Sequence, residues 1–189
     1  MGASLVFVDE TGFSLRPSVR RTWAPKGQTP IIRHHFNWQR LHVVGGICCK
    51  PDGTEPILEL QLQTVPVNSD STIAFIDAIH KIVEGPVVLI WDGLPAHRSA
   101  KVGEYIQAQS WLTVERLPAY APELNPVEYL WAAFKNKDLA NACVDSIEQL
   151  GEMLTVAYQR TETETTLLRG CLKASGLYNI DRFNLAESQ

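Results

Sequence analysis

Residues 87–97 read VVLIWDGLPAH, and this stretch decides the fold. Five apolar residues in succession predict a strand that is buried on both faces, as is typical of the interior of a parallel sheet. Asp92 follows this run directly, so we expect its carboxylate at the carboxyl end of the strand. Parallel sheets bind their ligands at this edge. The sequence therefore places an acidic side chain where an α/β protein builds its site.

Two other stretches have an acidic residue in a comparable position. Residues 5–8 (LVFV) predict a buried strand that ends at Asp9. Residues 118–131 read PAYAPELNPVEYLW, in which Asn125 suits a helix N-cap and Glu128 falls in the first helical turn. If the two strands are neighbours in the sheet, their acids converge, and Glu128 joins them from the helix that follows the fifth strand.

The chemistry of three converging carboxylates points to metal ions. Carboxylates that lie together repel one another, and divalent cations that prefer oxygen ligands relieve the repulsion. Two such ions, about 3.5–4 Å apart, activate a water or hydroxyl and stabilise the leaving oxygen of a phosphodiester. Each motif alone has a simpler explanation, because Asp9 and Asp92 also suit turns and Glu128 suits a helix capping box. Their joint order and spacing favour a metal site for phosphodiester chemistry.

The remaining patterns predict a mixed five-stranded sheet flanked by helices, which is an α/β fold. An Asp-Gly turn signal joins the two strands of a hairpin, and helical spacing with N-caps marks the helices. We expect further strands over 41–49, 56–63 and 112–117, and a short one near 20–24. We expect helices from 68–71 to about 85, over 99–109, from 125 onward, over 145–159 and over 165–172.

Length and composition fit one globular domain over residues 1–189. No apolar run approaches the roughly 18 residues of a membrane span, and no secretory signal is visible. None of the four cysteines falls in a Cys-x-x-Cys pair, so we expect no zinc site and free thiols in a reducing cytoplasm.

The net charge is −4, yet residues 11–51 hold seven basic side chains and no acidic one. This basic part of the chain suits a polyanionic partner.

Four motifs carry a resemblance to a known family. They are FVDETGF (7–13), WAPKGQTP (23–30), WDGLPAHRS (91–99) and LPAYAPELNPVE (117–128), and 35 residues separate Asp92 from Glu128. With these motifs the chain resembles the catalytic domain of DDE transposases, in the mariner-like superfamily and specifically its bacterial insertion-sequence branch. Gly93 departs from the Asn that many relatives have after the second Asp.

The resemblance implies a ribonuclease H-like fold, with a core over about 5–140 and a helical C-terminal part over 141–189. It implies an endonuclease and strand transferase that uses two Mg²⁺ or Mn²⁺ ions, with Asp9, Asp92 and Glu128 as the catalytic triad and metal ligands. Water would attack the phosphodiester at an element end, and the freed 3′ hydroxyl would attack target DNA, typically at a TA dinucleotide. The N-terminal helix-turn-helix domains that relatives carry are expected to be absent.

The resemblance also implies where the protein acts and with what. The expected partners are the DNA of element ends, target DNA and a second copy of the chain in a homodimer. No membrane and no small-molecule cofactor are expected. The expected location is the bacterial cytoplasm, at the nucleoid.

Five further residues are candidates for contacts with DNA. Arg20, Arg21, Lys26 and Arg98 suit the phosphate backbone. His97 lies five positions after Asp92 and is expected either to face the site, where it would orient water or contact phosphate, or to be an ordinary loop histidine.

The stretch around Glu128 offers two other residues of interest. Glu123 is also acidic, but its position before Leu124-Asn125-Pro126 favours Glu128 as the third acid. Trp131 shares its helix with other large apolar residues, so we expect it in the core rather than stacked on a base.

Two other functions remain open from the sequence. The first keeps the fold but makes the protein a structure-selective nuclease, such as a ribonuclease H or a junction resolvase. The second is an inactive or domesticated transposase remnant that serves as a binding module for DNA or a protein. Strand transfer separates the first from a transposase, and failure to bind divalent metal would favour the second.

Overall fold

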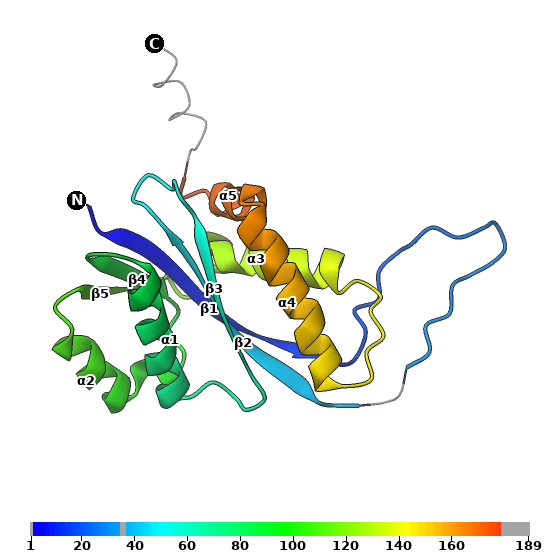
Figure 1. Ribbon diagram of the computed structural model, residues 1–189, viewed down its shortest axis with the longest axis horizontal. Coiled ribbons are helices and arrows are strands. Elements are labelled where there is room, and N and C mark those ends of the chain that lie inside the picture. The colour runs from blue at the N-terminus through cyan, green and yellow to red at the C-terminus, as the bar shows by residue number, and fades with distance from the viewer. Residues whose placement is uncertain (1, 35–36, 179–189) are drawn as a thin grey trace, which may run out of the picture.

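The centre of the protein is one five-stranded mixed sheet (Figure 1). The computed structural model describes residues 2–34 and 37–178. The strands are β1 (Ser4–Ser14), β2 (Arg40–Cys49), β3 (Ile57–Gln63), β4 (Val87–Trp91) and β5 (Leu112–Arg116). Their order in the sheet is β3-β2-β1-β4-β5. The pairs β3–β2 and β2–β1 are antiparallel, whereas β1–β4 and β4–β5 are parallel. The predicted mixed five-stranded sheet is confirmed.

Helices cover both faces of this sheet (Figure 1). One face packs against α1 (Ser69–Ile82) and α2 (Ala100–Ala108), and the other against α3 (Pro126–Ala133), α4 (Ile147–Thr163) and α5 (Thr166–Ala174). The predicted order of three strands, helix, strand, helix, strand and helices is confirmed. Among the described residues, no helix combines the length and the apolar character that crossing a membrane requires.

Strand β1 supplies side chains to both cores because side chains alternate along a strand. Val6 and Val8 lie in the core beneath α1 and α2, whereas Phe7 and Phe13 lie in the core beneath α3, α4 and α5. Asp9 therefore belongs to the face that α3 covers.

The prediction that β1 ends at Asp9 is wrong, because the strand continues to Ser14. Pairing with β2 sustains it, since the antiparallel ladder runs on to the pair Ser14 and Arg40. Pairing with β4 stops much earlier, at Phe7 and Ile90. Asp9 thus lies in the middle of its own strand but just beyond the end of its parallel neighbour.

Residues 15–34 and 37–39, between β1 and β2, belong to a long irregular loop that reaches away from the body of the protein (Figure 1). The short strand predicted near residues 20–24 is wrong, because this stretch finds side-chain partners instead of a strand. The backbone N–H of Arg20 donates to the side chain of Asn141 (2.7 Å), and its Nε donates to the side chain of Asn136 (2.7 Å).

Candidate functional site

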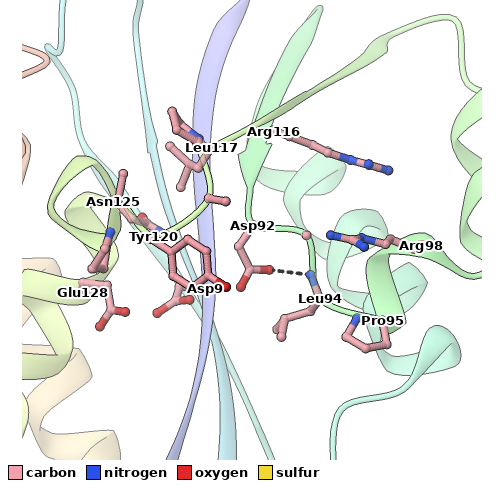
Figure 2. Close-up of a pocket in the computed structure, with 15 residues that line it drawn as sticks. Asp9, Asp92, Leu94, Pro95, Arg98, Arg116, Leu117, Tyr120, Asn125 and Glu128 are labelled. Carbon is pink, nitrogen blue, oxygen red and sulfur yellow. Dashed lines mark hydrogen bonds between the residues drawn. The ribbon is translucent and has the colours of Figure 1, made fainter.

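The three acidic residues that the sequence singles out line one pocket of about 550 Å³ (Figure 2). The pocket lies at the carboxyl ends of β4 and β5, where the parallel part of the sheet ends. Asp9 comes from β1, Asp92 directly follows β4, and Glu128 lies in the first turn of α3. The predicted convergence of the three side chains is therefore present in the structure.

Asp9 is the most deeply buried of the three, with 9% of its surface exposed. Its Oδ2 accepts a hydrogen bond from the indole N–H of Trp131 (2.7 Å). Burial raises the pKa of Asp9 to about 7; the charges of Glu128 and Glu10 add to the rise, and the Trp131 hydrogen bond opposes it. Ionisation of this carboxyl group near neutral pH therefore carries a cost that a bound cation would remove.

Trp131 is confirmed as a core residue, but its hydrogen bond to Asp9 was not predicted. The indole fits because Gly45, which pairs with Asp9 across β1 and β2, has no side chain. A Cβ at Gly45 would lie 2.5 Å from the nearest ring atom of Trp131. One signal in the sequence points to this contact: Trp131 follows Glu128 by three residues, which places both side chains on one side of α3.

Asp92 is partly exposed to the pocket. Its Oδ1 accepts a hydrogen bond from the backbone N–H of Leu94 (3.0 Å), which fixes the turn after β4 (Figure 2). The same oxygen lies 3.1 Å from Nδ1 of His97. Asp92 is therefore held on one carboxylate oxygen by two neighbours.

Glu128 is exposed, and the start of α3 is fixed by Asn125. The side chain of Asn125 accepts from the N–H of Val127 (3.1 Å) and donates to the carbonyl of Val8 (3.1 Å), which ties the helix to β1 beside Asp9. The backbone N–H of Asn125 donates to the carbonyl of Pro122 (2.9 Å). In a capping box the side chain of Glu128 would accept from the backbone N–H of Asn125, which is already bonded to Pro122. The carboxylate of Glu128 therefore remains available to the pocket.

His97 lies behind the pocket rather than in it. It is 4% exposed, and its ring stacks on Trp91 with centroids 3.9 Å apart. Burial lowers the pKa of His97, but the hydrogen bond and charge of Glu10, together with Asp92, outweigh this and raise it above its usual value. The ring is thus occupied by protein groups, and this placement does not favour direct contact with DNA.

Of the basic candidates, Arg98 lines the pocket and is exposed (Figure 2). Arg116, at the end of β5, also lines it and was not singled out in the sequence. Arg20, Arg21 and Lys26 belong to the long loop, and none of them lines the pocket. The structure therefore brings one of the predicted cationic residues to the acids.

The donor set of the pocket fits a hard divalent cation. Carboxylate oxygens are the ligands that Mg²⁺ and Mn²⁺ prefer. Burial is the main cause of the raised pKa of Asp9, and the negative charge of Glu128, whose repulsion a cation would relieve, adds to it. Asp9, Asp92 and Glu128 could hold such ions in the pocket. Asp92 also belongs to a group of possible metal ligands with Glu10 and His97, whose ligand atoms lie within 4.8 Å of one another.

Known families and structures resemble this chain along most of its length. Residues 4–151 match a family described as DDE superfamily endonuclease. No curated protein is similar enough to the chain to count as a match.

Several solved structures of Mos1 transposase share the fold. The Mos1 mariner paired end complex with Mn is 22% identical, with a TM-score of 0.61, over 91% of this chain and 52% of that chain. The Mos1 transposase paired-end complex with left transposon end is 21% identical, with a TM-score of 0.58, over 92% of this chain and 56% of that chain. The catalytic domain of Mos1 mariner transposase is 18% identical, with a TM-score of 0.51, over 92% of this chain and 83% of that chain. The chain thus spans about half the length of the chains in the two complexes. The structural similarity confirms the predicted ribonuclease H-like fold.

Proposed function

The chain belongs to the DDE superfamily of endonucleases, and from this premise we propose that it is the catalytic domain of a transposase. It would hydrolyse phosphodiesters at the ends of a mobile element and join the resulting 3′ ends to target DNA. The observation that carries the proposal is the meeting of Asp9, Asp92 and Glu128, from three separate motifs, in one pocket. Structures of Mos1 in complex with a transposon end support DNA as the partner.

The three acids would act as ligands for two Mg²⁺ or Mn²⁺ ions. When bound, such ions supply the Lewis acidity that activates an attacking oxygen and stabilises the leaving oxygen of a phosphodiester. The chain's own part is to hold its ligands in place. Trp131 orients the buried carboxylate of Asp9, and Asn125 fixes the turn of α3 from which Glu128 projects.

Two arginines at the pocket would bind the DNA backbone near the acids. Arg98 and Arg116 line the pocket, and a guanidinium matches the geometry of a phosphate. In the long loop, Arg21 and Lys26 are exposed and suit phosphates farther along the duplex. We further propose that the protein acts as a homodimer that holds two element ends. It would act in the cytoplasm of a bacterium, at the nucleoid. The paired-end complex of Mos1 supports the pairing of ends.

The experiment that tests this function measures nicking of supercoiled plasmid DNA with Mn²⁺, Mg²⁺ or EDTA. We expect metal-dependent nicking by the wild type and losses of at least about 100-fold in Asp92→Asn and Glu128→Gln, because each removes one charged ligand. Glu123→Gln is the matched control, since Glu123 is an exposed acid near α3 that does not line the pocket. Equal activity in all variants would refute the assignment of the site.

A second assay separates the alternatives. A short duplex with a free 3′ hydroxyl is incubated with plasmid, and covalent joining is scored. Joining supports a transposase, whereas nicking without joining supports a structure-selective nuclease. Absence of both activities together with absence of Mn²⁺ binding would support the remnant that acts as a binding module.

A further inference from the structure

We propose that His97 and Glu10 are positioning residues that hold the carboxylate of Asp92 in the orientation that metal binding requires. The inference rests on the proposed function, because it assigns Asp92 as a metal ligand. It gives His97 a role within the protein, in place of a contact with water or DNA.

The three residues form a continuous chain of polar contacts: His97 is hydrogen-bonded to the Glu10 side chain and to the Asp92 backbone oxygen, and it lies within ion-pair distance of the Asp92 carboxylate. Nε2 of His97 lies 2.7 Å from Oε1 of Glu10, and Nδ1 lies 3.1 Å from Oδ1 of Asp92 and 3.2 Å from its backbone oxygen. Both ring nitrogens therefore face oxygen acceptors. Chains of this kind, in which a carboxylate orients a histidine and the histidine orients a ligand, are common around metal sites.

The contacts on Asp92 leave one oxygen for a metal. Leu94 N–H and His97 Nδ1 both approach Oδ1, at 3.0 and 3.1 Å. Neither contact uses Oδ2. A side chain held on one oxygen by two neighbours cannot rotate freely, so its second oxygen keeps one direction in the pocket.

The imidazole is itself held firmly. Its ring lies parallel to that of Trp91, with centroids 3.9 Å apart and an interplanar angle of 4°. Trp91 is 2% exposed and directly precedes Asp92, so the stack fixes the ring relative to the ligand. The backbone N–H of His97 donates to the carbonyl of Leu94 (3.1 Å), and this bond closes the turn from Leu94 to His97.

Glu10 anchors the far side of the imidazole. It follows Asp9 on β1, and the two carboxylates point to opposite faces of the sheet because side chains alternate along a strand. The Glu10 side chain is 10% exposed, and its Oε2 is buried without a hydrogen-bond partner among the described residues. Burying a charged group this way is costly, which a role in orienting His97 would explain.

Two amide variants of His97 test the proposal, because each keeps one of the two contacts. In His97→Gln the amide nitrogen takes the place of Nε2, so the bond to Glu10 is kept and the contact with Asp92 is lost. In His97→Asn the amide nitrogen takes the place of Nδ1, so the contact with Asp92 is kept. The measurement is Mn²⁺ binding to the whole chain, by calorimetry and by electron paramagnetic resonance, below the melting temperature of every variant.

We expect His97→Gln to weaken Mn²⁺ binding by roughly 100-fold and His97→Asn by only about tenfold, because the Asn variant keeps the contact with Asp92 and loses the anchor on Glu10. The matched control is His80→Gln, because His80 also stacks on a tryptophan, Trp111, with centroids 3.9 Å apart, but does not line the pocket. Wild-type affinity in His97→Gln would overturn the proposal. Equal losses in both His97 variants that follow their losses of thermal stability would also overturn it, since they would show a structural role only.

Glu10→Ala provides a second test if His97→Gln does not fold. It removes the anchor on Nε2 and leaves the imidazole and its stack on Trp91 in place. We expect a loss of about tenfold in Mn²⁺ affinity, and wild-type affinity would overturn the proposal. If the wild type itself binds no Mn²⁺, the proposed function fails as well; binding that Asp92→Asn abolishes but His97→Gln and Glu10→Ala retain would overturn the positioning role alone.

Discussion

Replacement of Asp9 by Asn is expected to stabilise the metal-free protein at alkaline pH. Asp9 is buried, and its pKa rises from 3.8 to about 7, chiefly through burial and then through Glu128. A carboxyl group that binds its proton more tightly in the folded chain than in the unfolded chain lowers stability as the pH rises above its unfolded pKa. The loss begins near pH 4 and is complete above about pH 7. Asn has the same size, carries no charge and still offers an oxygen to Trp131.

The magnitude follows from the shift. A rise of about three pKa units corresponds to roughly 4 kcal/mol, at about 1.4 kcal/mol for each unit. Part of this penalty is already present at pH 5. Between pH 5 and pH 8 the free energy of unfolding of the wild type should therefore fall by about 3 kcal/mol relative to Asp9→Asn. For a chain of this size that corresponds to a relative change in Tm of roughly 6–12 °C.

The assay is urea unfolding followed by circular dichroism, in EDTA, at pH 5 and pH 8. Glu123→Gln is the control, because it removes an exposed acid and should follow the wild type at both values. If the free energies of unfolding of the wild type and Asp9→Asn change with pH in parallel, the idea that burial destabilises the ionised form of this carboxyl group is refuted. Added Mn²⁺ should stabilise the wild type at pH 8 and stabilise Asp9→Asn less, because a ligand that binds only the folded state raises its stability.

Three other changes probe the groups around Asp9, each by urea unfolding. Gly45→Ala should lower the free energy of unfolding by about 1–3 kcal/mol, because its methyl group would press on the Trp131 ring. Trp131→Phe should cost roughly 2 kcal/mol more at pH 8 than at pH 5, since it removes the N–H that stabilises the charged form of Asp9. Asn125→Ala should cost about 1–3 kcal/mol through loss of the cap and of the bond to the Val8 carbonyl, and an unchanged midpoint would contradict that role.

The sequence predicted the elements that local patterns define. The apolar run before Asp92 is β4, the Asp-Gly hairpin joins β2 and β3, and the cap at Asn125 starts α3. These features depend on residues close together in the chain, so propensity and turn chemistry suffice. The meeting of the acids was also predictable, because parallel strands end at the same edge of a sheet.

The parts that were missed depend on contacts between distant residues. The true length of β1 comes from its ladder with β2, and nothing in residues 9–14 alone indicates how far that pairing extends. Trp131 and Asp9 are 122 positions apart, and His97 and Glu10 are 87 apart. Such hydrogen bonds follow from the packing of α3 and of the turn after β4 on the sheet, which no local pattern specifies.

The opposite orientation of Asp9 and Glu10 on β1 restricts how this strand can change in evolution. A deletion or insertion of one residue between Ser4 and Val8 would turn every later side chain to the other face. The shorter acid would then face His97 and the longer acid would face Trp131, with both apolar cores disturbed at once. Exchange of one apolar residue for another is far milder, since it keeps the faces. We therefore expect the number of residues in β1 to be fixed among active relatives, whereas the loop that follows β1 can gain or lose residues beyond its ties to Asn136 and Asn141.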